Sequence, residues 1–436
     1  MYFFYNLILV IISPIFYLLC ILHPKLKQLR LKRKQSLSNL LNLNFIKSNQ
    51  FVIWFHSASV GELDQSRAVA RTIKNYSKRA YIIQSVYSNS VTEKQMNDPC
   101  FDATFILPFD FAFAYEPIFK KFKPDCLMIF AWDTWPNLIR SAKNSGAKTY
   151  LACASLSKTS GRTKGIAKLL TKKVFSYLDG IFLSHTIFES VIRPLVSKST
   201  VMEVLGDTRY DAVLQRIETG LPGSRFQTFI AKYEDQISNH KPVLLGSTYP
   251  ICETYLLHFL EKYNSDPLYR KEPIWIFPHK WEVDRMLVFR NQLQSFGSTA
   301  LFSELVDSEK KEKTSLPKFI LFDELGILAF AYKYAQFAYI GGALHHRIHN
   351  TIEPAAFGLA LITGPKITSA PEAIVMRSMG SLQVCETPDE FSEVFSFMLK
   401  DKDNTRSLGE KNRNFVLENR GASERIYHRV FSRDLS

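Results

Sequence analysis

Short apolar runs alternate with helical patterns along most of this chain, and this alternation limits the possible folds more than any other feature. The first set of runs is FVIWFHS (51–57), AYIIQSVY (80–87), ATFILPF (103–109), CLMIFAW (126–132), KTYLACAS (148–155), GIFLSHT (180–186) and VMEVLGDT (201–208). The second set is PVLLGST (242–248), PIWIFPH (273–279), KFILFDE (318–324), FAYIGGA (337–343), LALITGP (359–365) and LQVCET (382–387). Near-continuous apolar strands separated by helices are typical of βαβ units in a parallel sheet.

Two sets of runs in 436 residues predict two doubly wound, Rossmann-like α/β domains in series. The expected divisions are an N-terminal anchor with its basic flank, a first domain, a polar linker and a second domain with the terminal helix, at residues 1–34, 35–211, 212–240 and 241–436. Ligands of such sheets bind beyond the carboxyl ends of the strands. The cleft between the two domains is therefore the expected site.

The N-terminal segment, residues 2–22, is uncharged and just long enough to cross a bilayer core of ~30 Å. Six lysines and arginines follow within residues 25–34, whereas a signal peptide carries its positive charge before the apolar run. The positive-inside rule then keeps the body in the cytoplasm. Asn6, Ser13 and Pro14 weaken a span, so a helix lying in the membrane interface remains the alternative. The net charge of +14 also favours an anionic partner.

Glu62 is the first acidic residue of the chain, and it lies where the run 51–57 gives way to a helical pattern. Ser59-Val-Gly-Glu62 fits a capping box, in which Ser and Glu satisfy each other's main-chain amides. A carboxylate at the mouth of a cleft is equally placed to act as a general base on an incoming hydroxyl. The sequence leaves both roles open.

In the second domain, Asn350 suits a helix N-cap, and Pro354 suits a first helical turn. The free N–H groups of a helix starting at Thr351 would suit a phosphate. Glu353 is placed to accept hydrogen bonds from a ribose diol, or to complete the cap at Asn350. Arg209, at the end of the run 201–208, is an anion clamp or a surface arginine.

The segment 157–173 contains six basic residues, no acidic ones and several apolar ones. It predicts a basic amphipathic helix for membrane headgroups or an anionic lipid, or simply a solvated face. The histidines of HHRIH have no carboxylate or cysteine at ligand spacing, so a metal site is not expected. The chain has no P-loop and no strand–GxGxxG–helix unit, which argues against ATP hydrolysis and hydride transfer.

Six motifs together resemble the Kdo transferases, the 3-deoxy-D-manno-oct-2-ulosonic acid transferases of lipopolysaccharide synthesis (glycosyltransferase family 30). They are HSASVGE (56–62), WPNL (135–138), GDTRYD (206–211), GST (246–248), HNTIEPAAFG (349–358) and TGP (363–365). The likeness covers nearly the whole chain, the anchor included, and HSASVGE is the most specific part of it.

The resemblance implies a GT-B fold, a CMP-Kdo donor, a lipid A precursor (lipid IVA) as acceptor, inversion at the sugar, and no metal or other cofactor. It makes Glu62 the general base. It places Pro278, His279, Leu325, Gly326, Ile327, Asn350, Thr351, Ile352 and Glu353 around CMP. It also implies a bacterial inner membrane location with the catalytic body on the cytoplasmic side. It implies no nucleic-acid partner and leaves the oligomeric state open.

The chain departs from the family pattern in the loop before WPNL. The family pattern there is Glu-Thr-Glu-Leu, and the resemblance implies that its first glutamate stabilises the transition state. That glutamate is Ala131 here, and Asp133 stands in for the second. Arg209 replaces a lysine, His279-Lys280 replaces an Arg-His pair, and the loop before His349 is one residue shorter. The expected catalytic set is therefore Glu62, Asp133 and Arg209. A transferase for another nucleotide sugar, or a non-catalytic binder of anionic lipid, remains the alternative.

Overall fold

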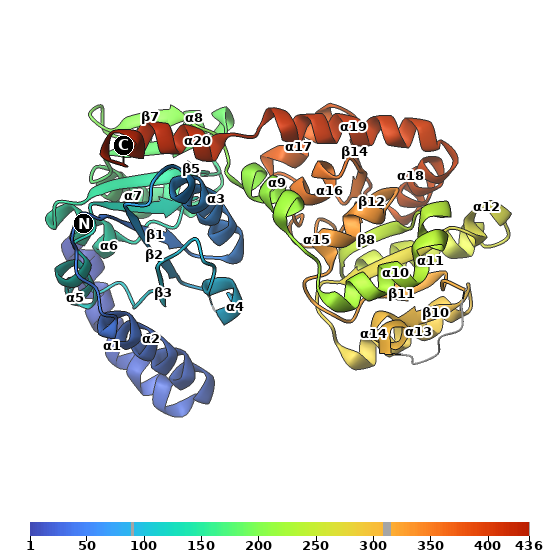
Figure 1. Cartoon of the computed structure of the whole chain (residues 1–436), viewed down its shortest axis with the longest axis horizontal. Helices are drawn as coiled ribbons and strands as arrows, with labels where there is room; N and C mark the ends of the chain where they lie inside the picture. Colours follow the sequence, from blue (N-terminus) through green and yellow to red (C-terminus); the bar gives the residue numbers. More distant parts are fainter. Residues whose placement is uncertain (89–90, 308–314, 436) are drawn as a thin grey trace. The chain divides into compact units, whose positions relative to one another are not determined.

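The computed structural model describes residues 1–88, 91–307 and 315–435, and these residues form two compact units (Figure 1). The first unit is Met1–Ala212 together with Asn419–Ser436, and the second is Val213–Glu418. Each unit contains a seven-stranded sheet in which every recorded strand pairing is parallel. The predicted pair of doubly wound α/β domains is therefore confirmed.

In the first unit, the strand order reverses between β1 and β4, because the sheet runs β3-β2-β1-β4-β5-β6-β7. The strands are β1 (Phe51–Ser57), β2 (Ala80–Val86), β3 (Ala103–Ile106), β4 (Cys126–Phe130), β5 (Lys148–Ala154), β6 (Gly180–Leu183) and β7 (Val201–Val204). The helices between them include α3 (Val60–Tyr76), α4 (Glu93–Met96), α5 (Ala112–Phe122), α6 (Pro136–Asn144), α7 (Gly165–Phe175) and α8 (Glu189–Ile192). Such a reversal is where doubly wound sheets bind ligands.

In the second unit, the reversal lies between β8 and β12, in the order β10-β11-β9-β8-β12-β13-β14. The strands are β8 (Val243–Thr248), β9 (Ile274–Pro278), β10 (Thr299–Leu301), β11 (Phe319–Leu321), β12 (Phe337–Ile340), β13 (Ala360–Thr363) and β14 (Leu382–Val384). The helices include α11 (Pro250–Tyr263), α12 (Pro267–Arg270), α13 (Val283–Gln294), α14 (Phe302–Asp307), α15 (Leu328–Ala331), α16 (Ile352–Ala356), α17 (Pro371–Ser378), α18 (Pro388–Lys400) and α19 (Lys402–Glu418).

The expected linker, 212–240, differs from the structure, because two helices fill most of it. These are α9 (Arg209–Thr219) and α10 (Ser224–Asn239). Phe226 and Phe229 of α10 are buried and lie within 6.4 and 5.6 Å of the Trp275 ring. Apolar residues at helical spacing therefore bind α10 to the core of the second unit, although the polar composition of the segment suggested a linker.

The end of the chain also differs from the expected division, because the last segment packs on the first unit. It comprises α20 (Ala422–Ile426), a short π-helical stretch (Tyr427–Phe431) and α21 (Ser432–Leu435). Ile426 and Phe431 are fully buried in the same apolar cluster as Phe55 of β1. The Asp211 carboxylate accepts hydrogen bonds from the main-chain N–H groups of Gly421 (2.6 Å) and Ser423 (2.7 Å).

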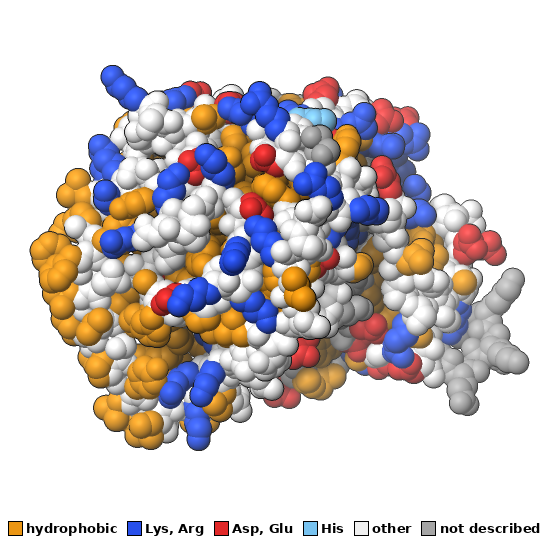
Figure 2. All heavy atoms as spheres, turned by 60° about the vertical axis from the view of Figure 1, so that its left-hand side comes forward, with side chains coloured by type: hydrophobic (Ala, Val, Ile, Leu, Met, Phe, Trp, Pro, Cys, Tyr) orange, Lys and Arg blue, Asp and Glu red, His pale blue; other side chains and the backbone are white. Residues whose placement is uncertain are grey.

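The N-terminal helices, α1 (Tyr2–Leu22) and α2 (Pro24–Asn42), belong to the first unit rather than forming a separate piece. Tyr2 and Leu40 are buried in its main apolar cluster. Most of α1 is nonetheless exposed. Among the described residues, α1 is the one helix that is both long enough and apolar enough to cross a membrane. Figure 2 shows hydrophobic side chains gathered on one side of the first unit, with lysines and arginines beside them.

Candidate functional site

Glu62 lies in the first turn of α3, directly beyond the carboxyl end of β1. One oxygen of its carboxylate, Oε2, accepts hydrogen bonds from the main-chain N–H groups of Ala58 (2.6 Å) and Ser59 (2.9 Å). The predicted capping box is therefore present. The side chain is also buried, and this burial, together with the charge of Asp133, raises the pKa of Glu62 to about 7. The cap fixes the carboxylate in position, while burial makes it a stronger base.

Asp133 lies in the loop between β4 and α6, on the other side of the strand-order reversal from Glu62. Its Oδ1 is 3.5 Å from Nη2 of Arg162, which also donates through Nη1 to the carbonyl of Trp132 (2.6 Å). The Arg162 guanidinium lies 4.9 Å from the centre of the Trp132 ring. Burial raises the pKa of Asp133, and the charge of Arg162 partly opposes that shift. The sequence placed Arg162 only in a basic segment and did not show that it holds this loop.

His56 and Trp135, from two of the recognised motifs, join the two sides of this reversal. Trp135 Nε1 donates to His56 Nε2 (3.0 Å), and His56 Nδ1 lies 2.9 Å from Ser85 Oγ. Burial lowers the pKa of His56 to about 3, so the ring is neutral. Since Nε2 accepts, the hydrogen-bond pattern assigns the proton to Nδ1. His56 thus positions the loops, and its 4.0 Å approach to Asp133 is not an ion pair.

Ala131, where the family glutamate is expected, has a left-handed backbone with φ of 62°. Its side chain is buried beside a cavity of about 10 Å³ that Leu156 and Phe175 also line. That cavity has space for about one water molecule. Asp133 is the acidic residue of this loop, and it lies close enough to Glu62 for its charge to raise the pKa of Glu62.

Arg209 is the first residue of α9, and the loop between β7 and α9 packs against α3 at Gln65, one turn beyond Glu62. Its Nε and Nη2 atoms each donate to Asp207 Oδ2 at 2.8 Å, and Gln65 of α3 donates to Asp207 Oδ1 (2.9 Å). Burial opposes ionisation of Asp207, but the charge and hydrogen bonds of Arg209 hold its pKa below the usual value. The Arg209 side chain is partly exposed, so the structure places it near the predicted base as an ion-paired cation.

In the second unit, the predicted donor residues lie at or beyond the carboxyl ends of three strands of the sheet. Pro278 ends β9, Gly326 follows β11 in a turn with φ of 88°, and Asn350 follows β12. In that turn Leu325 is fully exposed, whereas Ile327 is buried. These residues share one edge of the sheet, around the reversal between β8 and β12.

Tyr249, which the sequence analysis missed, lies at the centre of an aromatic cluster on this edge. Its ring stacks on His279 (4.8 Å between centres) and His349 (5.8 Å), and His345 meets it edge-on. The Tyr249 hydroxyl is 3.2 Å from His349 Nε2. Burial and neighbouring positive groups lower the pKa of His349 to about 4 and also lower that of His279. The lowered pKa values favour the neutral form of the His279 and His349 rings. Its only sequence signal was an aromatic residue directly after GST.

The loop before α16 confirms the predicted cap but changes the expected role of Glu353. Asn350 Oδ1 accepts from the N–H groups of Ile352 (2.9 Å) and Glu353 (3.4 Å). The Glu353 carboxylate instead pairs with Arg216 of α9. The side chains of Thr351 and Ile352 are fully buried, so any ligand contact by these two residues would come from their main chain.

Among residues 1–88, 91–307 and 315–435, no group of three or more His, Cys, Asp or Glu side chains is arranged to hold a metal ion. The prediction that the site works without metal stays a prediction.

Residues 29–212 match the family model described as 3-deoxy-D-manno-octulosonic-acid transferase (kdotransferase). A 3-deoxy-D-manno-octulosonic acid transferase of Chlamydia trachomatis serovar A is 22% identical over 392 residues, which cover 88% of this chain and 86% of the relative. The transferase of the same name from Chlamydophila psittaci is 25% identical over 384 residues, covering 86% and 84%.

Among solved structures, UDP-GlcNAc 2-epimerase from Neisseria meningitidis, bound to UDP-GlcNAc, superposes with a TM-score of 0.62. The match covers 86% of this chain and 98% of the epimerase at 12% identity, so it shows the fold alone. It confirms the predicted GT-B class of two Rossmann-like domains. With the motifs, the family model over residues 29–212 and relatives that match over most of its length, the chain is similar to the Kdo transferases, which are glycosyltransferases.

Proposed function

We propose that this protein transfers Kdo from CMP-Kdo to a lipid A precursor at a bacterial inner membrane. The observation that carries the proposal is Glu62, a buried carboxylate with a pKa of about 7, fixed by two main-chain amides beside Asp133. A general base is most effective when its pKa lies near the working pH. Within a Kdo transferase, this carboxylate is the base for the acceptor hydroxyl.

The acceptor side of the proposal is supported by a cavity of about 230 Å³ that reaches from Asp133 to the apolar helices. Tyr5 of α1, Trp135, Arg162 and Leu170 of α7 line it together with Asp133. Such a cavity combines one acid, one cation and apolar walls. That combination suits a phosphorylated sugar attached to acyl chains.

Helix α7 supports membrane contact close to this cavity. Ile166 and Leu169 are 76% and 55% exposed, and Lys172 and Lys173 are exposed on the same helix. Apolar residues flanked by lysines suit an anionic membrane surface. Together with α1, α7 supports location of the protein at the cytoplasmic face of the inner membrane.

The donor side is supported by the aromatic cluster of the second unit. The neutral rings of Tyr249, His279 and His349 suit stacking with the cytosine base. Glu353, held by Arg216, suits the ribose hydroxyls. The main chain around Asn350 and the turn at Gly326 suit the phosphate. We include independence from metal ions in the proposal.

In the proposed reaction, the acceptor hydroxyl oxygen attacks the anomeric carbon of Kdo while Glu62 takes its proton. The bond from that carbon to the phosphate oxygen of CMP breaks, and CMP leaves with the bonding electron pair. A single displacement of this kind inverts the anomeric centre. Asp133 stabilises the positive charge that develops on the sugar, and Arg209 attracts the donor anions.

Incubation of purified protein with CMP-Kdo and lipid IVA, followed by mass spectrometry of the lipid, tests the proposal. The expected product is lipid IVA carrying Kdo, with release of CMP and no loss of rate in excess chelator. Arms with other nucleotide sugars test the donor. Binding of lipid IVA without CMP release would show a non-catalytic binder and contradict the proposal.

The raised pKa of Glu62 predicts how the transfer rate depends on pH. Because a base must be ionised to accept a proton, the transfer rate should rise with pH through about 7 and then level off. The pH dependence of kcat/KM for CMP-Kdo measures this rise. A rate that is flat from pH 5.5 to 8 would contradict the assignment of Glu62 as the base.

A second prediction concerns the KM for CMP-Kdo of Arg209 variants. Arg209→Lys keeps the positive charge but loses the paired bonds to Asp207, and Arg209→Ala leaves the buried Asp207 carboxylate without its cation. We expect KM for CMP-Kdo to rise in the order Arg, Lys, Ala, by roughly tenfold or more for Ala. Asp207→Asn with Arg209→Ala controls for the unpaired carboxylate, since it removes both charges. Equal KM in all forms would place Arg209 outside the donor site.

A further inference from the structure

One stripe of side chains along helix α1 is covered by other parts of the first unit, α2 included. Tyr2, Asn6, Leu9, Ser13, Phe16 and Cys20 are buried or half-buried, at spacings of three or four residues. The opposite face is exposed and apolar, as at Phe4, Ile8, Ile11, Ile15, Leu18 and Leu22. This covered face contacts Pro136 and Asp110 at the start of α1, Phe109 at Phe16, and Leu26 of α2 at Cys20.

The first turn of α1 is fixed to the start of α6. The Tyr2 hydroxyl donates to the carbonyl of Pro136 (2.9 Å), and Asn137 Nδ2 donates to Asn6 Oδ1 (2.7 Å). The Tyr5 hydroxyl donates to Asp110 (2.8 Å), a buried carboxylate that also accepts from the main-chain N–H of Asn137 (3.0 Å). These bonds fix the N-terminal end of α1 to Pro136 and Asn137, which follow Asp133 closely in the sequence.

The other end of α1 is fixed to the same unit through α2. The Arg33 guanidinium of α2 is buried, donates to the carbonyls of Leu107 and Tyr87, and lies 4.2 Å from the centre of the Tyr87 ring. Ser36 Oγ accepts from the main-chain N–H of Ile106 (2.9 Å). The two ends of a 21-residue helix, about 31 Å apart, therefore both rest on the first unit.

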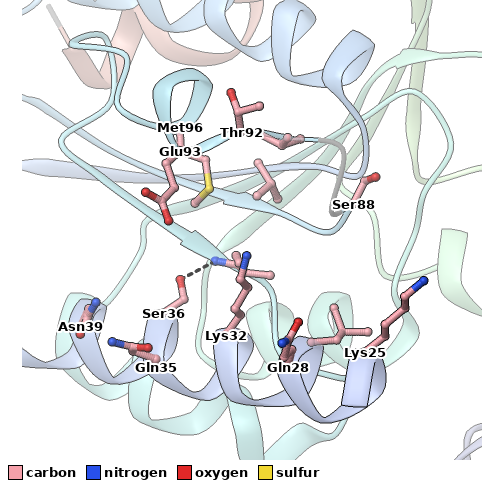
Figure 3. A pocket seen from close by; sticks show the side chains of 14 residues that line it. Lys25, Gln28, Lys32, Gln35, Ser36, Asn39, Ser88, Thr92, Glu93 and Met96 are labelled. Carbon is pink, nitrogen blue, oxygen red and sulfur yellow. Dashed lines mark hydrogen bonds between the residues drawn. The ribbon is translucent and has the colours of Figure 1, made fainter. Parts of the chain in front are cut away.

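The remaining side of α2 faces water. Gln28, Lys32, Gln35 and Asn39 point into an open groove of about 820 Å³, below the segment Thr92–Met96 (Figure 3). Amides and lysines of α2 line one side of this groove, and Val86, Val91 and Met96 line the other. The exposed amides and lysines favour a place for α2 at the edge of a membrane and not within its core.

We propose that α1 does not cross the bilayer but lies in the interface of one leaflet, with its exposed apolar face in the acyl region. If α1 crossed, its N-terminal end and α2 would lie on opposite sides of a core of ~30 Å. The contacts of Tyr2 with Pro136 and of Arg33 with Leu107 would then exclude each other. Lys25, Lys27 and Lys34 of α2 are exposed, and in this orientation they contact the anionic headgroups next to the apolar face of α1. This inference rests on the membrane part of the proposed function.

Depth measurements test this orientation in the full-length protein, reconstituted in vesicles of phosphatidylethanolamine and phosphatidylglycerol. Spin labels are attached to single cysteines made by Phe4→Cys, Ile11→Cys and Leu18→Cys. The six native cysteines are buried and give the background. A helix in the interface puts all three labels at one depth, ~5–10 Å into the headgroup and acyl boundary. A clear maximum at Ile11, near the bilayer centre, would overturn the proposal.

Protease protection gives an independent measurement of sidedness. Cleavable epitopes are placed before Met1 and after Ser436, and both are expected to be cut in inside-out membrane vesicles and protected in right-side-out ones. Cleavage of the N-terminal epitope from the outer side would overturn the proposal. Neither measurement uses catalysis, so the transfer assay above can fail or succeed independently of them.

Discussion

Glu62→Gln is expected to fold normally and to transfer Kdo at least ~100-fold more slowly than the wild type, since loss of a general base typically costs 10²–10⁴-fold. Gln can still accept the hydrogen bonds of Ala58 and Ser59, because a capping box takes Glu or Gln. Any loss of stability from the cap should therefore stay below about 1 kcal/mol. Transfer rate and Tm, measured on the same preparation, separate the two roles of this residue.

The direction of the pKa shift adds a second readout for this variant. Because the folded state raises the pKa of Glu62 from 4.5 to about 7, Glu62 contributes stability below pH 4.5 that is lost as the pH rises through 7. Glu62→Gln lacks this loss, so its Tm should not fall below that of the wild type at pH 8. Glu116→Gln, an exposed carboxylate of α5, is the matched control and should transfer normally. Normal transfer by Glu62→Gln would leave Glu62 as a helix cap alone.

Asp133→Asn is expected to lower the transfer rate at least ~10-fold and to shift the pH dependence as well. The substitution removes a negative charge that stabilises positive charge on the sugar, so turnover falls. It also removes one of the two causes that raise the pKa of Glu62, so the rising part of the pH profile should move below pH 7. Full pH profiles of kcat for both proteins measure the two effects together.

Asp64→Asn is the control for Asp133→Asn, because Asp64 lies on α3 two residues after Glu62 and pairs with Arg67 (2.7 Å). We expect it to leave both the rate and the pH profile unchanged. If Asp133→Asn turns over at the wild-type rate, Asp133 has not taken over the role of the glutamate that Ala131 replaces.

The sequence alone determined the two parallel sheets. Side chains of strands such as β1 and β4 are buried on both faces, so their runs are apolar without alternation, and this pattern is visible in one dimension. The site motifs were equally readable, because a strand end followed by Ser59-Val-Gly-Glu62 is a local arrangement. The segment 212–240 was misjudged because two amphipathic helices of polar composition look like a linker until their apolar faces meet a core.

Only the tertiary structure decided the properties that depend on contacts between distant segments. The pKa of Glu62 is set by burial and by Asp133, 71 positions away by the residue numbers, and the stacking of Tyr249 on His279 and His349 joins three separate loops. The same holds for α1: its composition allows a membrane span, and its hydrogen bonds to Pro136 and Asp110 place it along the protein. Hydropathy indicates whether a helix is stable in an apolar environment, whereas its position depends on the hydrogen bonds that its polar side chains form.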